Sequence, residues 1–152
     1  MNTTTDSPFD LANDSGYQAW REQKIADHPA DLEQLEVEIQ NPQHLTAAER
    51  EAILERCRRA NMAIYAGPTG DDPDTHIIRD LGRQFGLERL DHNPGADEDA
   101  ISSLSVQEDA YHRRYIPYTN RPIAWHTDGY YNTPERQVHG LVLHCVQTAD
   151  AG

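Results

Sequence analysis

The sequence predicts an α+β fold in which helices come early and strands come late. Three observations lead to this fold class. Helix signals, including a capping box, lie within residues 16–86, and period-two alternation marks residues 35–39. Strand-like apolar segments follow at 101–107, 123–128 and 138–147. Apolar repeats of two residues are typical of half-buried strands, whereas repeats near 3.6 residues are typical of amphipathic helices.

The N-terminal residues predict a disordered tail followed by a short helix. Residues 1–15 are rich in Thr, Asp, Ser and Asn and carry little that could form a core. We expect a helix from Gly16 to Ala26, with Ser15 as its N-cap and Pro29 beyond its end. Residues 16–152 are then interpreted as part of a single domain.

The next segment contains the clearest local signals. Thr46 and Glu49 have the spacing of a capping box, and the helix that they begin should run to about Arg59. Residues 62–65 predict a buried strand. The pair Asp72-Pro73 predicts a second helix, with Asp as N-cap and Pro at the first helical position. Gly86 is expected to end this helix. Its expected buried stripe is Ile77, Ile78, Leu81 and Phe85.

The C-terminal part predicts an acidic loop and then a sheet. The loop covers residues 91–100, and residues 138–147 have apolar side chains on both faces, as expected of a central strand. A central strand with only five residues after it would leave an apolar edge uncovered, which natural folds avoid. We therefore expect this chain to be the N-terminal part of a domain that is truncated at its C-terminus.

The charge balance excludes several classes of partner. The chain of 152 residues has 13 basic and 26 acidic side chains, a formal net charge of -13. Nucleic acids and anionic membranes attract basic surfaces, so neither is an expected partner. No apolar run is long enough for a membrane span, and no secretory signal is present. The two cysteines, Cys57 and Cys145, are interpreted as reduced core residues of a cytoplasmic protein.

The most informative motif is a histidine followed two residues later by an aspartate. On an extended strand, this spacing points the side chains of His126 and Asp128 to the same face. A neutral imidazole and a carboxylate are two of the three ligands in the 2-His-1-carboxylate site for Fe(II). A surface histidine beside a turn aspartate is the simpler alternative. His139 or His144 could complete the site, but their opposite parity lets at most one of them face His126.

A longer stretch around the motif resembles a known family. The residues IAWHTDGYYN at 123–132, GLVLHCV at 140–146 and the ending ADAG resemble the taurine dioxygenase-like (TauD/TfdA) family of Fe(II)- and 2-oxoglutarate-dependent oxygenases. The resemblance implies that His126 and Asp128 are iron ligands. It also implies a double-stranded β-helix, or jelly-roll, of which this chain would hold an incomplete part after its N-terminal helices.

The same resemblance implies that the catalytic machinery is incomplete in these residues. In the family, a distal His ligand and an Arg that pairs with 2-oxoglutarate lie much further along the chain, and no counterpart of either is present here. We therefore expect the parent protein to be a dioxygenase that hydroxylates a small organic acid or amine with O2, Fe(II) and 2-oxoglutarate. The 152-residue chain alone should be inactive.

The residues around the motif suggest where a substrate would bind. Tyr118, Asn120 and Arg121 immediately precede the motif strand, and Tyr130 could form a wall of a pocket. Arg121 belongs with two further arginines at 113–114 to a small basic group. This group either attracts an anionic substrate or balances the charge of the acidic loop.

Two functions of other classes stay open at this point. One is a non-catalytic remnant or interaction domain that has the same fold beginning. The other is a zinc hydrolase built from His126, Asp128 and His144, because zinc accepts these ligand types. A homo-oligomer is possible, and the sequence does not identify the substrate.

Overall fold

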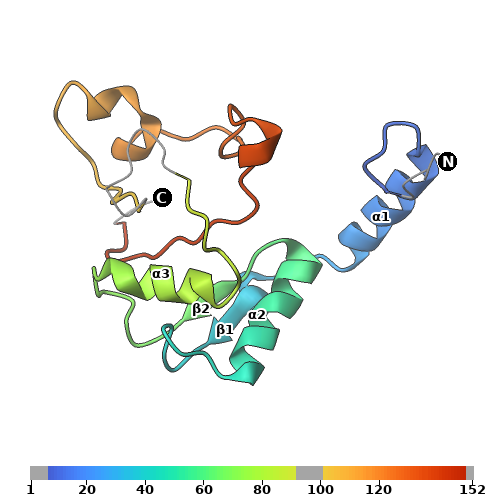
Figure 1. The fold of residues 1–152 in the computed structure, drawn as a ribbon, viewed down its shortest axis with the longest axis horizontal. Coiled ribbons are helices and arrows are strands. Elements are labelled where there is room, and N and C mark those ends of the chain that lie inside the picture. Colours follow the sequence, from blue (N-terminus) through green and yellow to red (C-terminus); the bar gives the residue numbers. More distant parts are fainter. Residues whose placement is uncertain (1–6, 92–100, 150–152) are drawn as a thin grey trace. The chain divides into compact units, whose positions relative to one another are not determined.

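A computed structural model describes residues 7–91 and 101–149 of the chain (Figure 1). Its contacts divide the chain into two compact units, one of Met1–Gln84 with Cys145–Gly152 and the other of Phe85–His144. The first unit contains the regular elements. They are α1 (Asp14–Ala26), β1 (Glu36–Glu38), α2 (Ala47–Ala60), β2 (Ile64–Ala66) and α3 (Thr75–Arg83).

Helix α1 is present where the sequence predicts a helix, but its start is different. Its N-cap is Asn13 rather than Ser15, because the Asn13 side chain accepts a hydrogen bond of 3.0 Å from the Gly16 amide. Residues 7–13, which the sequence assigns to a disordered tail, form hydrogen-bonded turns that lead into the helix. Residues 1–6 lie outside the described part of the chain.

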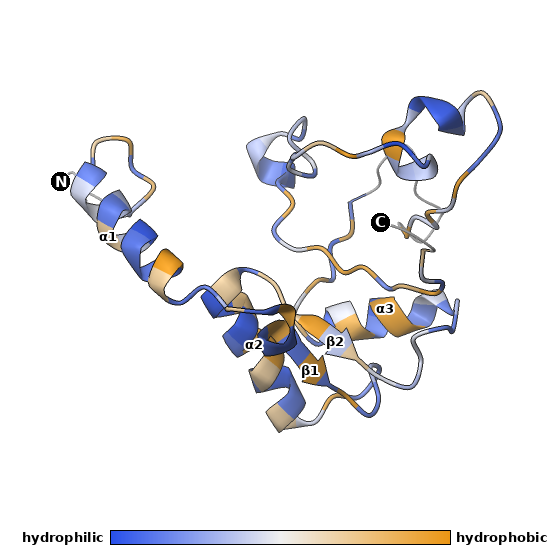
Figure 2. Cartoon of the chain, turned by 180° about the vertical axis from the view of Figure 1, so that it is seen from behind, coloured by the Kyte–Doolittle hydropathy of each residue, from blue (hydrophilic) through white to orange (hydrophobic). Residues whose placement is uncertain are grey.

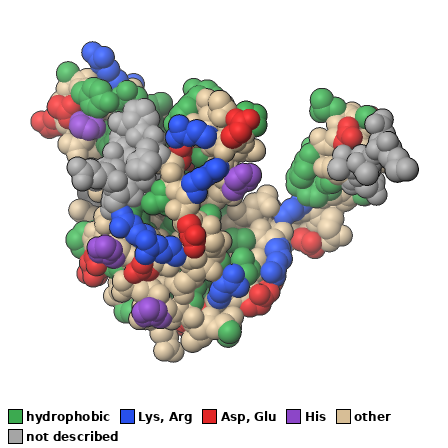
Figure 3. Space-filling view, in the orientation of Figure 1, with side chains coloured by type: hydrophobic (Ala, Val, Ile, Leu, Met, Phe, Trp, Pro, Cys, Tyr) green, Lys and Arg blue, Asp and Glu red, His purple; other side chains and the backbone are tan. Residues whose placement is uncertain are grey.

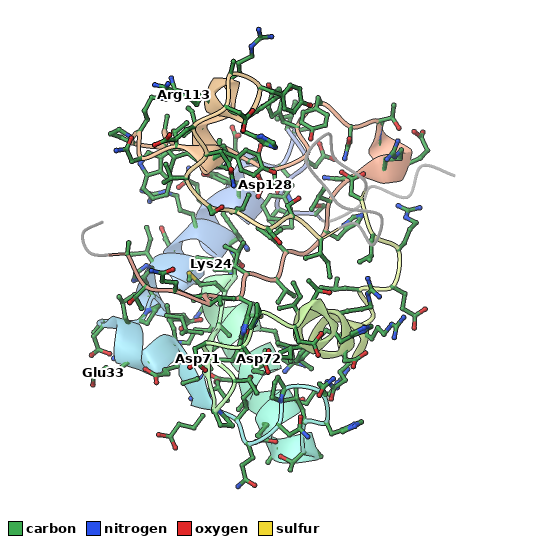
Figure 4. All side chains as sticks on the ribbon, turned by 90° about the vertical axis from the view of Figure 1, so that its left-hand side faces the viewer. Lys24, Glu33, Asp71, Asp72, Arg113 and Asp128 are labelled. Carbon is green, nitrogen blue, oxygen red and sulfur yellow. The ribbon has the colours of Figure 1, made fainter. Side chains whose placement is uncertain are left out.

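Polar contacts attach α1 to the end of α2. The ammonium group of Lys24, which is labelled in Figure 4, donates to the Arg58 carbonyl at 2.7 Å and to the Asn61 side chain at 2.9 Å. Arg59 donates in return to the Asp27 carbonyl at 2.7 Å. A cation at a helix C-terminus meets unpaired carbonyls and the negative end of the helix dipole. Since α1 has no buried residue, these contacts carry its attachment.

Strands β1 and β2 form a two-stranded parallel sheet. Val37 pairs with Tyr65, and α2 connects the two strands and contacts β1. A helical crossover is the usual connection between parallel strands. The strand predicted at residues 35–39 is therefore confirmed at its centre, and the one predicted at 62–65 begins two residues later, at Ile64.

Helix α2 begins with the predicted capping box. The Glu49 amide donates to the Thr46 hydroxyl at 3.2 Å, and the Thr46 amide donates to the Glu49 carboxylate at 2.6 Å. The Thr46 hydroxyl bonded to this carboxylate is the main cause of a lowered Glu49 pKa. The helix ends at Ala60, one residue beyond the predicted end, because Asn61 adopts the left-handed conformation that terminates helices.

Helix α3 begins later than the sequence predicts. Its N-cap is Asp74, which accepts from the His76 amide at 2.9 Å. The expected cap, Asp72, instead accepts from the Asp74 amide at 3.0 Å, so its side chain stabilises the turn before the helix. Pro73 consequently lies outside the helix. The helix ends at Arg83, with Gln84 as its C-cap, so it stops before Gly86, where the sequence predicts its end. Gly86 has a positive φ of 80° and lies in the turn that follows.

The core of the first unit is small and lies between the sheet and α3. Its most buried side chains come from residues 35–42 and from the apolar face of α3. Two of the four positions in the predicted α3 stripe are fully buried, and the other two are half-buried. The buried set is Leu35, Val37, Ile39, Pro42, Ile77 and Leu81.

The second unit contradicts the predicted strands. Residues 101–107, 123–128 and 138–147 have irregular backbone, and the regular turns among the described residues of this unit are the 3-10 helices His112–Arg114, Ile116–Tyr118 and Pro134–Arg136. A strand is stable when a neighbouring strand takes its backbone donors and acceptors, and the described residues supply none for these segments. No jelly-roll is present in the described ranges. Figure 2 shows hydrophobic colour on irregular segments as well as on the strands.

Two further expectations concern single features. The acidic loop predicted at 91–100 falls outside the described residues except for Asp91. Both cysteines are free thiols, but Cys145 is exposed, so its assignment to the core is wrong. Cys57 is half-buried, and burial raises the pKa of its thiol. Within the ranges that the structure describes, no helix is long and apolar enough to cross a bilayer.

Candidate functional site

His126 and Asp128 lie next to each other at the start of a turn. Nε2 of His126 is 3.5 Å from Oδ1 of Asp128. The side chains are 49% and 53% exposed, so both groups are accessible from solvent. The strand that was predicted to place them on one face is not formed; irregular backbone and the turn at 128–131 bring the two side chains together instead. Asp128 is labelled in Figure 4.

The other ring nitrogen of His126 is already occupied. Its Nδ1 lies 2.9 Å from the carbonyl oxygen of Ala124. Because a carbonyl can only accept, this contact places a proton on Nδ1. A neutral ring then presents the lone pair of Nε2 toward the Asp128 carboxylate. Metal-bound histidines typically have this arrangement, since the hydrogen bond at one nitrogen fixes the tautomer and orients the other.

The distance between the two groups fits a shared metal ion. Divalent first-row ions hold nitrogen and oxygen ligands at about 2.1 Å. Two such ligands are then about 3.0 Å apart at adjacent octahedral positions and about 3.4 Å apart in a tetrahedron. The observed 3.5 Å between Nε2 and Oδ1 is close to both values. The pair is therefore suited to supply two ligands to one ion.

A complete metal site is not formed by the described residues. Among them, no group of three or more His, Cys, Asp or Glu side chains is placed to hold a metal ion. His139 is exposed and His144 is half-buried. The face drawn in Figure 3 shows histidine side chains (purple) as well as hydrophobic ones (green). Neither predicted third ligand thus joins His126 and Asp128.

The four candidate substrate residues have different environments. Tyr118 is buried, and its ring packs edge-on against His112 at 4.9 Å. Asn120 is exposed, whereas Arg121 donates to the Thr119 hydroxyl at 3.4 Å. Tyr130 is 81% exposed. These surroundings do not identify a substrate pocket. A cavity of about 520 Å³ beside β1 and the start of α2 is lined by none of the four.

The three arginines predicted to act as a group are linked at one point. The Arg121 guanidinium donates to the Arg113 carbonyl at 3.3 Å, so the Arg121 side chain is held against the backbone at Arg113. The side chains of Arg113 and Arg114 are exposed. The basic group is therefore accessible to anions in solution.

The residue before the motif, Trp125, is fully exposed, although a large aromatic side chain is more often found in a core. The extended strand that would have turned Trp125 away from His126 and into a sheet is not formed, so nothing covers its indole among the described residues. The aromatic neighbours Tyr130 and Tyr131 pack edge-on against each other at 5.3 Å and are also largely exposed.

Sequence reasoning missed one well-formed contact in this unit. The Asp109 carboxylate accepts from Nδ1 of His112 at 2.7 Å and from the His112 amide at 3.0 Å. The amide hydrogen bond is the main cause of a lowered Asp109 pKa. An aspartate three residues before a histidine is the local signal for this kind of cap.

Comparison with protein-family models, with curated proteins and with solved structures found no match for this chain.

Proposed function

We propose that His126 and Asp128 are two of the protein ligands of an Fe(II) centre in a 2-oxoglutarate-dependent dioxygenase. One observation carries this proposal. Nε2 of His126 faces Oδ1 of Asp128 at 3.5 Å while Nδ1 is held by the Ala124 carbonyl. The resemblance of residues 123–132 to the TauD/TfdA family supports iron as the ion and a small organic acid or amine as the substrate.

The electrostatics of the pair support a bound cation. Nε2 of His126 lies 3.5 Å from the negatively charged Asp128 carboxylate. A cation between the two atoms would contact both of them. A divalent ion also satisfies both groups at once, and the solvent exposure of the pair gives it access.

Each part of the proposed centre has a distinct role. Bound iron, chelated by 2-oxoglutarate, would supply the oxidising chemistry with O2. His126 contributes a neutral, oriented ligand, and Asp128 contributes negative charge that retains the divalent ion. The proposal requires a second histidine and an anchor for 2-oxoglutarate from elsewhere in the complete protein. It also includes the jelly-roll fold that the family resemblance implies for the complete protein.

Metal binding by the 152-residue chain is the first test. Titration with Co(II), a spectroscopic substitute for Fe(II), should give a weak complex that involves His126. His126→Ala and Asp128→Ala should each weaken binding by at least about tenfold, because each removes a direct ligand. His44→Ala is the matched control, since His44 is an exposed imidazole without a side-chain partner in the described residues. Equal affinity in all four proteins would contradict the proposal.

Activity is the second test and applies to the complete gene product. Sequencing the gene past the codon for Gly152, with the intact mass of the native protein, defines that product. We expect it to form succinate from 2-oxoglutarate in the presence of Fe(II) and substrate, and His126→Ala and Asp128→Ala should abolish this activity. A fully active variant of either kind would show that the assignment is wrong. Tight zinc binding with no response to iron would favour a hydrolase instead.

A further inference from the structure

The turn that carries Asp128 is closed by an unusual concentration of contacts. The Asn132 amide donates to the Gly129 carbonyl at 2.8 Å. Gly129 has a positive φ of 64°, a conformation that favours glycine. A side chain at Gly129 would also collide with its neighbours, since a Cβ there would lie 2.6 Å from Cγ2 of Val138. The backbone immediately after Asp128 is therefore tightly defined.

A distant aspartate holds this turn from outside. The Asn132 side-chain amide donates to Oδ2 of Asp91 at 3.1 Å and to the Arg136 carbonyl at 3.0 Å. Oδ1 of Asp91 accepts from the Arg136 guanidinium at 2.9 Å. Both oxygens of one carboxylate are thus used on the segment that follows Asp128, although Asp91 is 41 residues from Asn132 in the sequence.

A second contact ties the same two segments together. Arg89 donates to the Glu135 carbonyl at 2.8 Å. Residues 89–91 are therefore attached to the 3-10 helix Pro134–Arg136 by two side chains, and to Asn132 by one of them. Charge-assisted hydrogen bonds of this kind are shorter and stronger than neutral ones, and both of these involve an arginine.

We infer that Asp91 and Asn132 are positioning residues, which hold the turn after Asp128 so that its carboxylate faces His126. The inference rests on the proposed function, because it gives the Asp128–His126 geometry a role in metal binding. Asp91 does not contact His126 or Asp128 in any described interaction. It acts through Asn132, Gly129 and the turn backbone. Removing the Asp91 carboxylate leaves the Asn132 amide and the Arg136 guanidinium without this acceptor and releases the turn.

A network that only stabilised the surface would behave differently from one that positions a ligand. Loss of a structural contact changes the stability of the turn, but it does not change how a bound metal is coordinated. Loss of a positioning contact changes the geometry and affinity of the metal complex even where the chain stays folded. The partners of metal ligands typically contribute between about tenfold and about 100-fold in metal affinity.

The test compares Asp91→Ala and Asn132→Ala with two controls. Asp91→Glu keeps the carboxylate. Asp109→Ala removes another aspartate of the same unit, which has its own histidine partner and no contact with the turn. Asn132→Ala leaves the ion pair between Asp91 and Arg136 in place, so it reports on the turn even if Asp91→Ala unfolds this unit. Each protein is assayed by Co(II) titration, by the visible spectrum of the complex, and by hydrogen exchange at the amide of residue 132 without metal.

We expect Asp91→Ala and Asn132→Ala to exchange faster at this amide and to bind Co(II) about tenfold more weakly, with an altered spectrum. Asp91→Glu should recover most of the affinity, and Asp109→Ala should match the unaltered chain. If His126→Ala abolishes Co(II) binding but Asp91→Ala leaves both affinity and exchange unchanged, the inference is wrong and the proposed function stands. If Co(II) binding is independent of His126, the proposed function fails and the role in metal binding fails with it.

Discussion

Residues 35–84 and residues 101–144 differ in how they satisfy their backbone and their apolar side chains. The first region pairs its backbone within α2, α3 and the β1–β2 sheet, and it buries six side chains. The second region relies on 3-10 turns and single side-chain contacts, and it leaves most of its large apolar groups exposed. The comparison teaches that a strand forms here where the described residues supply a partner, as β1 and β2 do for each other, whereas the apolar segments at 101–107 and 123–128 have none.

The largest effect on stability is expected when a leucine is replaced by alanine in each of the two regions. Leu81 is 3% exposed and Leu143 is 70% exposed. Leu81→Ala should lower the free energy of unfolding by about 2–5 kcal/mol, because it removes a buried side chain and leaves a cavity. Leu143→Ala should change it by less than about 0.5 kcal/mol. Urea denaturation followed by circular dichroism measures both values.

The reverse result would be informative for the second region. A cost for Leu143→Ala that approaches that of Leu81→Ala would mean that residues 138–147 are covered in solution. That outcome would favour the strand which the sequence predicts there and would break the comparison between the two regions.

The contrast also explains which parts of the fold the sequence predicts. The two residues of the capping box, Thr46 and Glu49, lie within one helical turn. The buried stripe that contains Ile77 and Leu81 lies on a single helix. Sequence patterns therefore identify both features. The pattern at residues 138–147 is equally clear. A strand, however, also needs a neighbour to pair with, and the described residues provide none. Hydrophobic alternation shows what a segment can bury but not whether a partner is present.

The conformation of the candidate site was not predicted. The side chains of His126 and Asp128 lie close together, but a bend and a turn bring this about where a strand was expected. Asp91 and Asn132 were missed because their contact spans 41 residues and leaves no local pattern. Tyr118 was grouped with the substrate residues from its position alone, and its burial against His112 depends on packing that spacing does not encode.

A smaller difference in stability is expected between alanine substitutions at two glycines with positive φ. Gly129 has a φ of 64° and no room for a Cβ, whereas Gly86 has a φ of 80° and nothing within 4 Å of a Cβ. Left-handed backbone costs a non-glycine residue about 1–3 kcal/mol. We expect Gly86→Ala to fall at the lower end and Gly129→Ala at the upper end. Hydrogen exchange at residues 132–138, and at the last turn of α3, measures each locally.

If the two glycine variants lost equal amounts of stability, Val138 would have to move away from the turn without a cost in free energy. The close packing of the turn after Asp128 would then have no role in defining its shape, and the second region would be as loosely held there as its exposed segments suggest.

The smallest predicted effect is a dependence on pH of the cap in the first region. The Thr46 hydroxyl holds the pKa of Glu49 below its ordinary value of 4.5. A carboxylate with a lowered folded-state pKa stabilises the fold above its unfolded pKa, and this contribution is lost as the pH falls through the folded value. Stability should therefore decline on acidification below about pH 4.5. Thr46→Ala should reduce this dependence, and urea denaturation across that range measures it.

The second region has its own carboxylate of this kind. Hydrogen bonds from His112 lower the pKa of Asp109, so acid should also weaken the turn at 109–112. A Thr46→Ala chain that kept its full acid dependence would assign the effect to Asp109 or to another group rather than to the capping box.

The exposed indole of Trp125 makes the motif observable by tryptophan fluorescence. The chain has two tryptophans, and Trp20 packs against Phe9 at 5.0 Å in the N-terminal segment, whereas Trp125 is fully exposed. A water-exposed indole emits at longer wavelength than a packed one. Paramagnetic ions quench the emission of nearby fluorophores, and Trp125 is covalently adjacent to His126. A chain with Trp20→Phe would therefore report the arrival of a metal at the motif through the loss of a single, red-shifted signal.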